Sequence, residues 1–291
     1  MKITNKHGLP DAFVRLAESE YIPQPGVYRV TELLKGTRET LLNRRYHSQI
    51  EVDVADMVWL LFGTAVHSML ESQQERAEEI KESRLSVDFG HAKLTGQFDL
   101  YNAEEKKITD YKTASIWKII YGDYADWKKQ LLIYACLLGD VGFPVYQADV
   151  VAFLKDHSKT EARRKADYPQ LPVQKINFQF SAQDHRETVA FIDYKLKELE
   201  HFSDKPDAAL PLCTPEERFN SGDKFAVMKG NNKRALRVLD SEEEARQWME
   251  DNPGKGGDWV EHRPGVDRKC IDYCNVREFC NHYKEEVEPC L

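Results

Sequence analysis

The chain has 291 residues, of which 41% are hydrophobic and 31% are charged, and its formal net charge is −8. This composition is ordinary for a soluble globular protein, and the length allows one full core plus a smaller module. The negative charge argues against a protein that coats nucleic acid indiscriminately, although it leaves room for a local basic path. The N-terminal sequence lacks the apolar segment of a secretory signal, and the longest apolar runs are too short to span a bilayer, so we expect a cytosolic protein.

The first part of the chain, residues 1–55, is expected to form short helices and loops that lead into the core. From Asp56 to about Ile80, the apolar spacing predicts one long helix. This helix carries His67 and Glu71, which are four residues apart and therefore share one face. Taken alone, a histidine on an apolar helix is more often a core residue than a metal ligand.

The most informative stretch is GQFDLYNAEEKKITDYKTAS, residues 96–115, which predicts two short strands joined by a polar turn. Asp99 lies on the first strand, and alternation places Asp110 and Lys112 on one face of the second. Two carboxylates that face each other across a hairpin, with an ammonium group beside them, suit a site that holds a hard divalent cation and hydrolyses a phosphodiester. The alternative is a pair of acids that merely decorate a solvent-facing hairpin.

The segments that follow alternate between helix and strand patterns. Residues 124–139 predict a helix with Gln130 and Tyr134 on one face, which alone would be an ordinary amphipathic helix. Two further strands are expected at residues 145–154 and 173–180. This order of helices and strands predicts an α/β arrangement with a mixed central sheet.

A third helix is expected to begin at Ser181, because Asp184 follows three residues later in a capping pattern. The character of the sequence changes after Pro211, where a hairpin, a helix and a further strand form a small α+β unit. This unit, about residues 214–269, is an insertion within a cysteine-rich C-terminal region. The expected parts are therefore a helical lead-in, a core and that C-terminal region, at residues 1–55, 56–210 and 211–291.

Four short motifs follow one another along the chain. They are GTAVH with His67, GQFD with Asp99, DYK with Asp110 and Lys112, and QLLIY with Gln130 and Tyr134. Together they resemble the PD-(D/E)XK nuclease superfamily, in its RecB-like exonuclease branch, which includes phage and bacterial enzymes and those of CRISPR adaptation. The resemblance covers roughly residues 55–140 and implies a restriction-endonuclease-like core, with a mixed sheet flanked by helices.

The resemblance also implies roles for the motif residues. The expected ligands of Mg²⁺ or Mn²⁺ are His67, Asp99, Asp110 and the main-chain carbonyl of Tyr111. An imidazole ligand favours Mn²⁺ somewhat. Lys112 would orient the attacking water or stabilise charge in the transition state, and Gln130 and Tyr134 would hold Lys112 or contact DNA. Glu71 could ligate a second metal or anchor a metal-bound water.

Six cysteines are present, and three of them lie close together near the C-terminus. RecB-like nucleases often hold an iron–sulfur cluster with one upstream and three C-terminal cysteines, and the layout here is similar. The implied ligands of a [4Fe–4S] cluster are Cys213, Cys270, Cys274 and Cys280. The three-residue gap after Cys270 is one longer than usual, and structural zinc is the alternative. Cys290 could replace one of these ligands, and Cys136 is expected in the core.

Two basic clusters are candidates for DNA contacts or, equally, for solvated loops. They contain Lys155, Arg163 and Arg164 in the first, and Lys229, Lys233 and Arg234 in the second. No nucleotide-binding P-loop motif is present, so a helicase or a single-strand annealing protein is a possible partner.

The sequence thus predicts a metal-dependent DNA exonuclease that acts in recombination, repair or phage DNA processing. We expect it in the cytoplasm of a bacterium or a phage-infected host cell. The alternatives are a structure-specific or restriction-type endonuclease on the same fold, and a non-catalytic DNA-binding assembly module.

Overall fold

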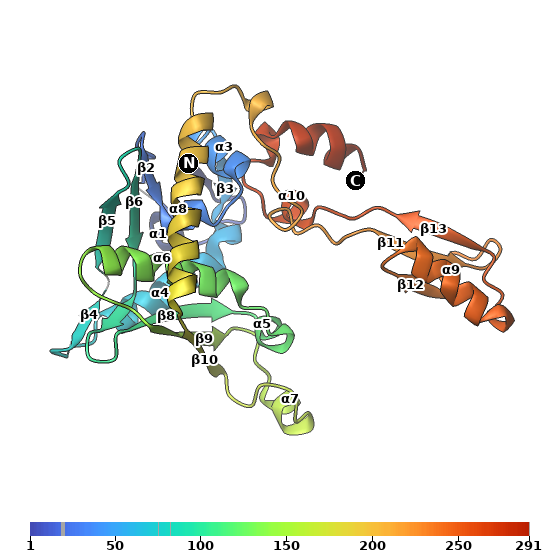
Figure 1. Ribbon diagram of the computed structural model, residues 1–291, viewed down its shortest axis with the longest axis horizontal. Helices are drawn as coiled ribbons and strands as arrows, with labels where there is room; N and C mark the ends of the chain where they lie inside the picture. The colour runs from blue at the N-terminus through green and yellow to red at the C-terminus, as the bar shows by residue number, and fades with distance from the viewer. Residues whose placement is uncertain (19–20, 75, 82, 291) are drawn as a thin grey trace. The chain divides into compact units, whose positions relative to one another are not determined.

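The computed structural model describes every residue except 19–20, 75, 82 and 291. The chain divides into two compact units, Met1–Leu210 and Pro211–Leu291. Residues 1–55 belong to the first unit, together with the predicted core (Figure 1). Within the described part of the chain, no helix is long and apolar enough to cross a membrane.

A five-stranded mixed sheet forms the centre of the first unit, as predicted. Its strands β8 and β9 run parallel, whereas the other neighbouring pairs are antiparallel. The order across the sheet is β10 (Val173–Gln179), β9 (Gln147–Leu154), β8 (Lys107–Ala114), β7 (Leu100–Asn102) and β4 (Glu79–Lys81).

The sequence of the two central strands explains their position. In β8, Ile108 and Ala114 are buried with Asp110 at alternating positions, so one face of the strand meets the core. In β9 the buried residues are nearly continuous, as expected for a strand with neighbours on both edges and cover on both faces. Asp110 is therefore a buried charged residue on the face that also carries Ile108, Lys112 and Ala114.

Two long helices, α6 (Ala125–Asp140) and α8 (Ala182–Phe202), pack on each other and cover the sheet (Figure 1). The contact is apolar, since Leu137 of α6 and Leu196 of α8 are fully buried. The predicted start of α8 is confirmed: Ser181 and Asp184 form a reciprocal capping box. An ion pair of 2.7 Å between Lys128 and Asp184 joins the two helices at that end.

The prediction of one helix from Asp56 to Ile80 was wrong in its second half. The helix α4 ends at Glu71, and residues 79–81 form strand β4, in which Ile80 lies opposite Tyr101 of β7. Sequence periodicity cannot show this pairing, because the partner strand is distant in the chain. The helical lead-in also contains strands, since β1 (Lys2–Thr4), β2 (Val27–Arg29) and β3 (Glu51–Asp53) accompany α1 (Asp11–Ala17), α2 (Val30–Leu33) and α3 (Thr37–Arg45).

A second, three-stranded sheet has the order β2, β6 (Lys93–Gln97) and β5 (Arg84–Asp88). Strand β6 passes so close to α6 that a Cβ added at Gly96 would lie 2.7 Å from the Tyr134 ring and 2.8 Å from Val30. Only glycine allows this approach. The strand that leads to Asp99 is thereby fixed against Tyr134.

The second unit contains the predicted strand–strand–helix insertion. Strand β11 lies between β12 and β13, antiparallel to both. Ser241 caps the helix by accepting from the Glu244 N–H. The insertion is followed by a short helix and then by the cysteine-rich tail. The bounds are β11 (Lys224–Met228), β12 (Arg237–Leu239), α9 (Glu242–Asp251), β13 (Trp259–Arg263) and α10 (Arg268–Asp272).

Candidate active site

Strand β8 supplies the centre of the site. Asp110 and Lys112 lie on one face, and the Lys112 Nζ is 2.9 Å from Asp110 Oδ2 and 3.1 Å from Oδ1. Asp110 is only 3% exposed, whereas the lysine reaches partly into solvent. The partly exposed ammonium therefore forms an ion pair with this buried carboxylate.

Asp99 lies at the bend where the chain leaves the three-stranded sheet and enters the five-stranded one, between β6 and β7. Its Oδ2 accepts a hydrogen bond of 2.7 Å from the Tyr111 N–H. This is possible because β7 pairs with β8 only as far as Leu100 and Thr109, which leaves the next part of the β8 edge to Asp99. In an extended strand the N–H and C=O of one residue point to the same side, so the Tyr111 carbonyl faces the same edge of β8 as its N–H.

His67 joins the site from α4 (Val58–Glu71), where its Nδ1 lies 3.3 Å from Asp99 Oδ1. The helix comes close to β8 at Gly63, where an added Cβ would lie 3.3 Å from the Thr113 hydroxyl oxygen. His67, Asp99 and Lys112 line one cleft of about 400 Å³. The other residues of its lining are Trp59, Leu60, Gly63, Thr64, Gln97, Tyr111 and Thr113.

Electrostatics sets Asp110 apart from an ordinary buried acid. Burial raises its pKa, the nearby Asp99 carboxylate raises it further, and Lys112 and His67 act in the opposite direction. Its Oδ2 is buried and accepts no hydrogen bond of good geometry from the described residues. A buried carboxylate with an unsatisfied oxygen and an acidic neighbour is costly on its own, and a bound cation would relieve that cost.

The chemistry of the donors suits a hard divalent cation, although the ligand atoms of His67, Asp99 and Asp110 do not all lie within 4.8 Å of one another. The donor set offers carboxylates from Asp99 and Asp110, an imidazole nitrogen from His67 and the main-chain carbonyl of Tyr111. Carboxylate and carbonyl oxygens are the preferred ligands of Mg²⁺ and Mn²⁺, and a single imidazole is compatible with Mn²⁺ in particular.

The structure places the remaining motif residues outside this donor set. Gln130 and Tyr134 lie on α6 and pair with each other, with 3.3 Å between Gln130 Nε2 and the Tyr134 hydroxyl. Tyr134 is buried against Gly96, three residues before Asp99, and neither α6 residue is among the described lining of the cleft. Glu71 is exposed at the end of α4 and is also outside that lining.

The cysteines form a second cluster, within the C-terminal unit. Burial, Asp267 and then the thiols of Cys274, Cys213 and Cys280 raise the pKa of Cys270 to about 12. The other three thiols are thus near enough to Cys270 to act on its charge, whereas among the described residues only Asp267, Cys270 and His282 bring three ligand atoms within 4.8 Å of one another. The side chain of Cys290 lies outside the described residues. Cys136, by contrast, lies in the first unit on α6, where burial raises its pKa to about 11.

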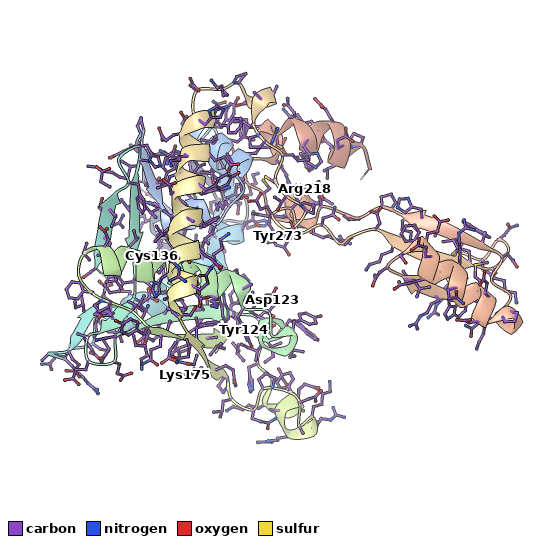
Figure 2. The ribbon with its side chains drawn as sticks, in the orientation of Figure 1. Asp123, Tyr124, Cys136, Lys175, Arg218 and Tyr273 are labelled. Atoms are coloured by element: carbon purple, nitrogen blue, oxygen red, sulfur yellow. The ribbon has the colours of Figure 1, made fainter. Side chains whose placement is uncertain are left out.

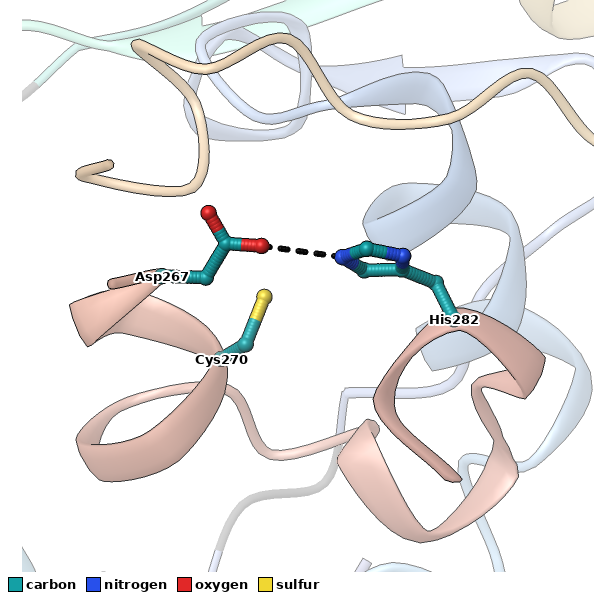
Figure 3. A group of neighbouring side chains, drawn as sticks. All are labelled: Asp267, Cys270 and His282. Atoms are coloured by element: carbon teal, nitrogen blue, oxygen red, sulfur yellow. Dashed lines mark hydrogen bonds and ion pairs between the residues drawn. The ribbon is translucent and has the colours of Figure 1, made fainter. Parts of the chain in front are cut away.

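Asp267 and His282 stand beside Cys270, and sequence reasoning missed both (Figure 3). The Asp267 Oδ2 is 2.9 Å from His282 Nε2, and Arg218 and Asn220 also bond to this carboxylate. These partners hold the pKa of Asp267 below its usual range despite burial, which alone would raise it. The three-residue spacing of Asp267 and Cys270 was the available signal. With its carboxylate already bonded to three side chains, Asp267 supports the cysteine cluster better than it would replace a thiolate.

The predicted basic residues lie in three places. Lys155 follows β9, with its Nζ 4.6 Å from the centre of the Trp59 ring. Arg163 and Arg164 are exposed at the end of α7 (Lys159–Arg164), a short helix where a loop was expected. The second cluster, in the other unit, is exposed in the turn between β11 and β12 and comprises Lys229, Lys233 and Arg234.

The first unit has a mixed sheet flanked by helices, with paired acids and a lysine where the central strands meet. This combination defines a nuclease of the restriction-endonuclease-like fold. The family model of the PD-(D/E)XK nuclease superfamily matches residues 31–281. The chain belongs to that superfamily.

Solved structures with similar folds include three that differ widely in sequence from this chain. The crystal structure of SSO0001 has a TM-score of 0.47 and 15% identity, over 68% of this chain and 87% of its own. The alkaline exonuclease LHK-Exo from Laribacter hongkongensis, in complex with dAMP, has a TM-score of 0.38 and 13% identity, over 60% and 92%. A phage-related exonuclease from Haemophilus somnus has a TM-score of 0.30 and 15% identity, over 60% and 79%. No curated protein matches the chain.

Proposed function

We propose that the chain is a metal-dependent DNA exonuclease that hydrolyses phosphodiester bonds at the cleft between α4 and β8. The observation that carries this proposal is Asp110, a buried acid beside a second acid, a histidine and a lysine, whose Oδ2 contacts the Lys112 ammonium but accepts no hydrogen bond of good geometry from the described residues. A structural role alone would not account for a carboxylate left in this state.

The residues of the cleft have distinct tasks in this proposal. His67, Asp99, Asp110 and the Tyr111 carbonyl would hold Mg²⁺ or Mn²⁺. Such a cation supplies Lewis-acid polarisation of the scissile phosphate and lowers the pKa of water. The Tyr111 N–H keeps Asp99 oriented, because it bonds one carboxylate oxygen and leaves the other toward His67.

Lys112 places a positive charge next to the reacting phosphate. Its ammonium lies partly in solvent while it contacts Asp110, so it can orient the attacking water or stabilise the negative charge that grows in the transition state. Gln130 and Tyr134 act as positioning residues, since Tyr134 packs under the strand that leads to Asp99. Glu71 remains a candidate for a second metal or for a bound water.

We propose that Cys213, Cys270, Cys274 and Cys280 hold a [4Fe–4S] cluster, with structural zinc as the alternative. The gathering of these thiols around Cys270 supports a four-thiolate site, which suits either group. Purified protein with broad visible absorbance and stoichiometric iron and sulfide would support the cluster. Stoichiometric zinc without iron would overturn it.

DNA processing in recombination, repair or phage replication, in the cytoplasm of a bacterium or an infected cell, agrees with a nuclease of this superfamily. The exposed Lys155, Arg163 and Arg164, with the second cluster on the insertion, would contact DNA phosphates and make binding salt-dependent. A helicase or a single-strand annealing protein would supply ends to such an enzyme.

Digestion of linear and closed circular DNA tests the proposed activity. With Mn²⁺ or Mg²⁺, the protein is expected to degrade end-labelled linear DNA and to leave closed circles intact. Nicking or linearisation of the circles would instead show an endonuclease on the same fold. Asp99→Asn, prepared in parallel, should be inactive on both substrates, which assigns the activity to this cleft. No hydrolysis by the wild-type protein with either metal would overturn the proposal.

A further inference from the structure

The helix that carries His67 exposes an unusual amount of apolar surface. Among the residues of α4, none is buried, and Trp59 is 58% exposed. Leu60, Phe62 and Met69 on the same helix are also exposed. Large apolar side chains in one exposed group usually mark a binding surface.

Trp59 belongs to the candidate active site as well as to this surface. It lines the same cleft as His67, Asp99 and Lys112, so a nucleotide whose phosphate reached those residues would place its own or the next base beside the indole. The Nζ of Lys155 lies 4.6 Å from the centre of the indole ring and adds positive charge at its face.

A second pair of exposed aromatic residues lies on α5 (Ile116–Tyr121), directly after the strand that carries Lys112. Trp117 and Tyr121 are 54% and 76% exposed, and their rings stack with 5.8 Å between centres and 26° between planes. Trp117 also borders a hollow of about 480 Å³, whose charged lining consists of Lys165, which pairs with Glu161 at 2.8 Å, and of Asp156, Glu161 and Asp167.

Lys155 connects the two aromatic sites. Its main-chain N–H bonds to the Ala114 carbonyl at 3.0 Å, immediately before the start of α5, while its side chain reaches Trp59. Lys155 therefore lies between Trp59, which lines the cleft, and the start of the helix that carries the Trp117–Tyr121 pair. We call Trp59, Lys155 and the Trp117–Tyr121 pair the aromatic flank.

We propose that the aromatic flank binds single-stranded DNA, with unpaired bases stacked on Trp59 and on the Trp117–Tyr121 pair while the phosphates follow Lys155 and Lys112. This inference rests on the proposed nuclease function and adds its substrate class, a single-stranded end. Base stacking on aromatic side chains tolerates any sequence and needs faces that a paired duplex keeps hidden between its own bases. The positive charge at the Trp59 face favours this polyanion over an apolar protein partner.

Binding measurements in the Asp110→Asn background test the proposal without hydrolysis. The probes are a fluorescent single-stranded oligothymidylate and a blunt duplex of the same length. Trp59→Ala and Trp117→Ala are each expected to weaken oligothymidylate binding by about 10-fold, and duplex binding by no more than about 2-fold. Both rings are exposed, so the melting temperatures of these variants should stay close to that of the parent.

Two matched variants separate stacking from other effects. Tyr146→Ala removes a ring that is 54% exposed and has Lys106 Nζ 5.4 Å from its centre, at the opposite end of β9, and it should change neither affinity. Trp59→Phe should keep most of the binding, whereas Trp59→Leu should lose as much as Trp59→Ala, because leucine is apolar but has no aromatic face.

Equal losses on both probes, or no loss on either, would overturn the aromatic flank as a single-strand site. Unchanged DNA binding in all Trp59 variants would point to a protein partner on α4 instead. The result is distinct from the activity test: if the wild-type protein hydrolyses nothing but Trp59→Ala still loses single-strand binding selectively, the binding site stands and the nuclease proposal fails.

Discussion

Asp110 and Asp149 are buried acids on neighbouring strands of one sheet, yet their surroundings differ. Asp149 of β9 is 2% exposed and is met by Lys107, Lys175 and Asn177, at 3.3, 2.9 and 2.9 Å (Lys175 is labelled in Figure 2). Burial alone would raise its pKa, but these partners hold it below its usual range. Asp110 has one lysine and an acidic neighbour, and its pKa is raised.

The difference in partners and pKa shifts distinguishes Asp149, a structural acid, from Asp110, which we propose to be a metal ligand. Around Asp149, the folded chain itself compensates the buried charge. Around Asp110, Lys112 compensates the charge only in part, and in our proposal a bound divalent cation completes the compensation. Both side chains have little solvent exposure, and the difference in their pKa shifts comes from stronger desolvation at Asp110 together with the different partners of the two carboxylates.

The largest expected effect is on catalysis. Asp110→Asn should lower nuclease activity at least about 1,000-fold, because the loss of a metal ligand removes several kcal/mol of transition-state stabilisation. Asp149→Asn should stay within about 3-fold of the wild-type rate at a temperature where both are folded, since it lies outside the site. Rates of release of labelled nucleotides measure both. Equal losses in the two variants would erase the proposed distinction.

Lys112→Gln should lower nuclease activity less than Asp110→Asn does, but still strongly. We expect about a 100-fold loss in kcat, because the ammonium acts on charge that develops in the transition state. Metal binding should persist or tighten, since the positive charge beside Asp110 is gone. Steady-state kinetics together with a Mn²⁺ titration would check this, and a loss of metal binding with unchanged kcat would contradict the assigned role.

The effects on stability should run in the opposite order, with Asp149→Asn more destabilising than Asp110→Asn. Asp149→Asn should lower the free energy of unfolding by about 2 kcal/mol at neutral pH, because charge-assisted bonds to two lysines are lost. The folded-state pKa of Asp149 is depressed, so this contribution is present above its ordinary value of 3.8 and is lost as pH falls through the lower folded-state value. Urea unfolding at a series of pH values should show the gap between variant and wild type narrowing only below pH 3.8.

The smallest effect concerns the metal-free protein. In the presence of a chelator, Asp110→Asn should raise the free energy of unfolding by about 1 kcal/mol, because it removes a poorly compensated buried charge. Added Mn²⁺ should stabilise the wild type and not this variant. A destabilised Asp110→Asn protein would mean that Lys112 alone compensates the carboxylate.

The sequence predicted the fold class and the proximity of the motif residues, whereas the course of the chain around the candidate site required the structure. Strand alternation was sufficient to place Asp110 and Lys112 together, because the rule is local. The change of sheet at Asp99 and the end of α4 depend on pairing with strands that are distant in the chain. Local sequence patterns do not predict such pairing. The aromatic flank was missed for a related reason: the apolar residues of α4 look like core residues until the structure shows that they are exposed.

Asp149 illustrates the same limit. In sequence it is one more acid in an apolar strand, much like Asp110, and neither Lys107 nor Lys175 is near it in the chain. Only the register of β8, β9 and β10 brings its partners together. The order of the motifs in the sequence distinguished Asp110 from Asp149. The difference in their electrostatic surroundings could be seen only in the structure.

Direct measurement of Mn²⁺ binding tests the central claim, that the incompletely compensated Asp110 marks a divalent-metal site. Electron paramagnetic resonance of free Mn²⁺ during titration would give stoichiometry and affinity for the wild type, Asp110→Asn and Asp149→Asn. We expect the wild type and Asp149→Asn to bind Mn²⁺ with similar affinity, and Asp110→Asn to lose at least about 10-fold. Identical binding by the wild type and Asp110→Asn would contradict the account.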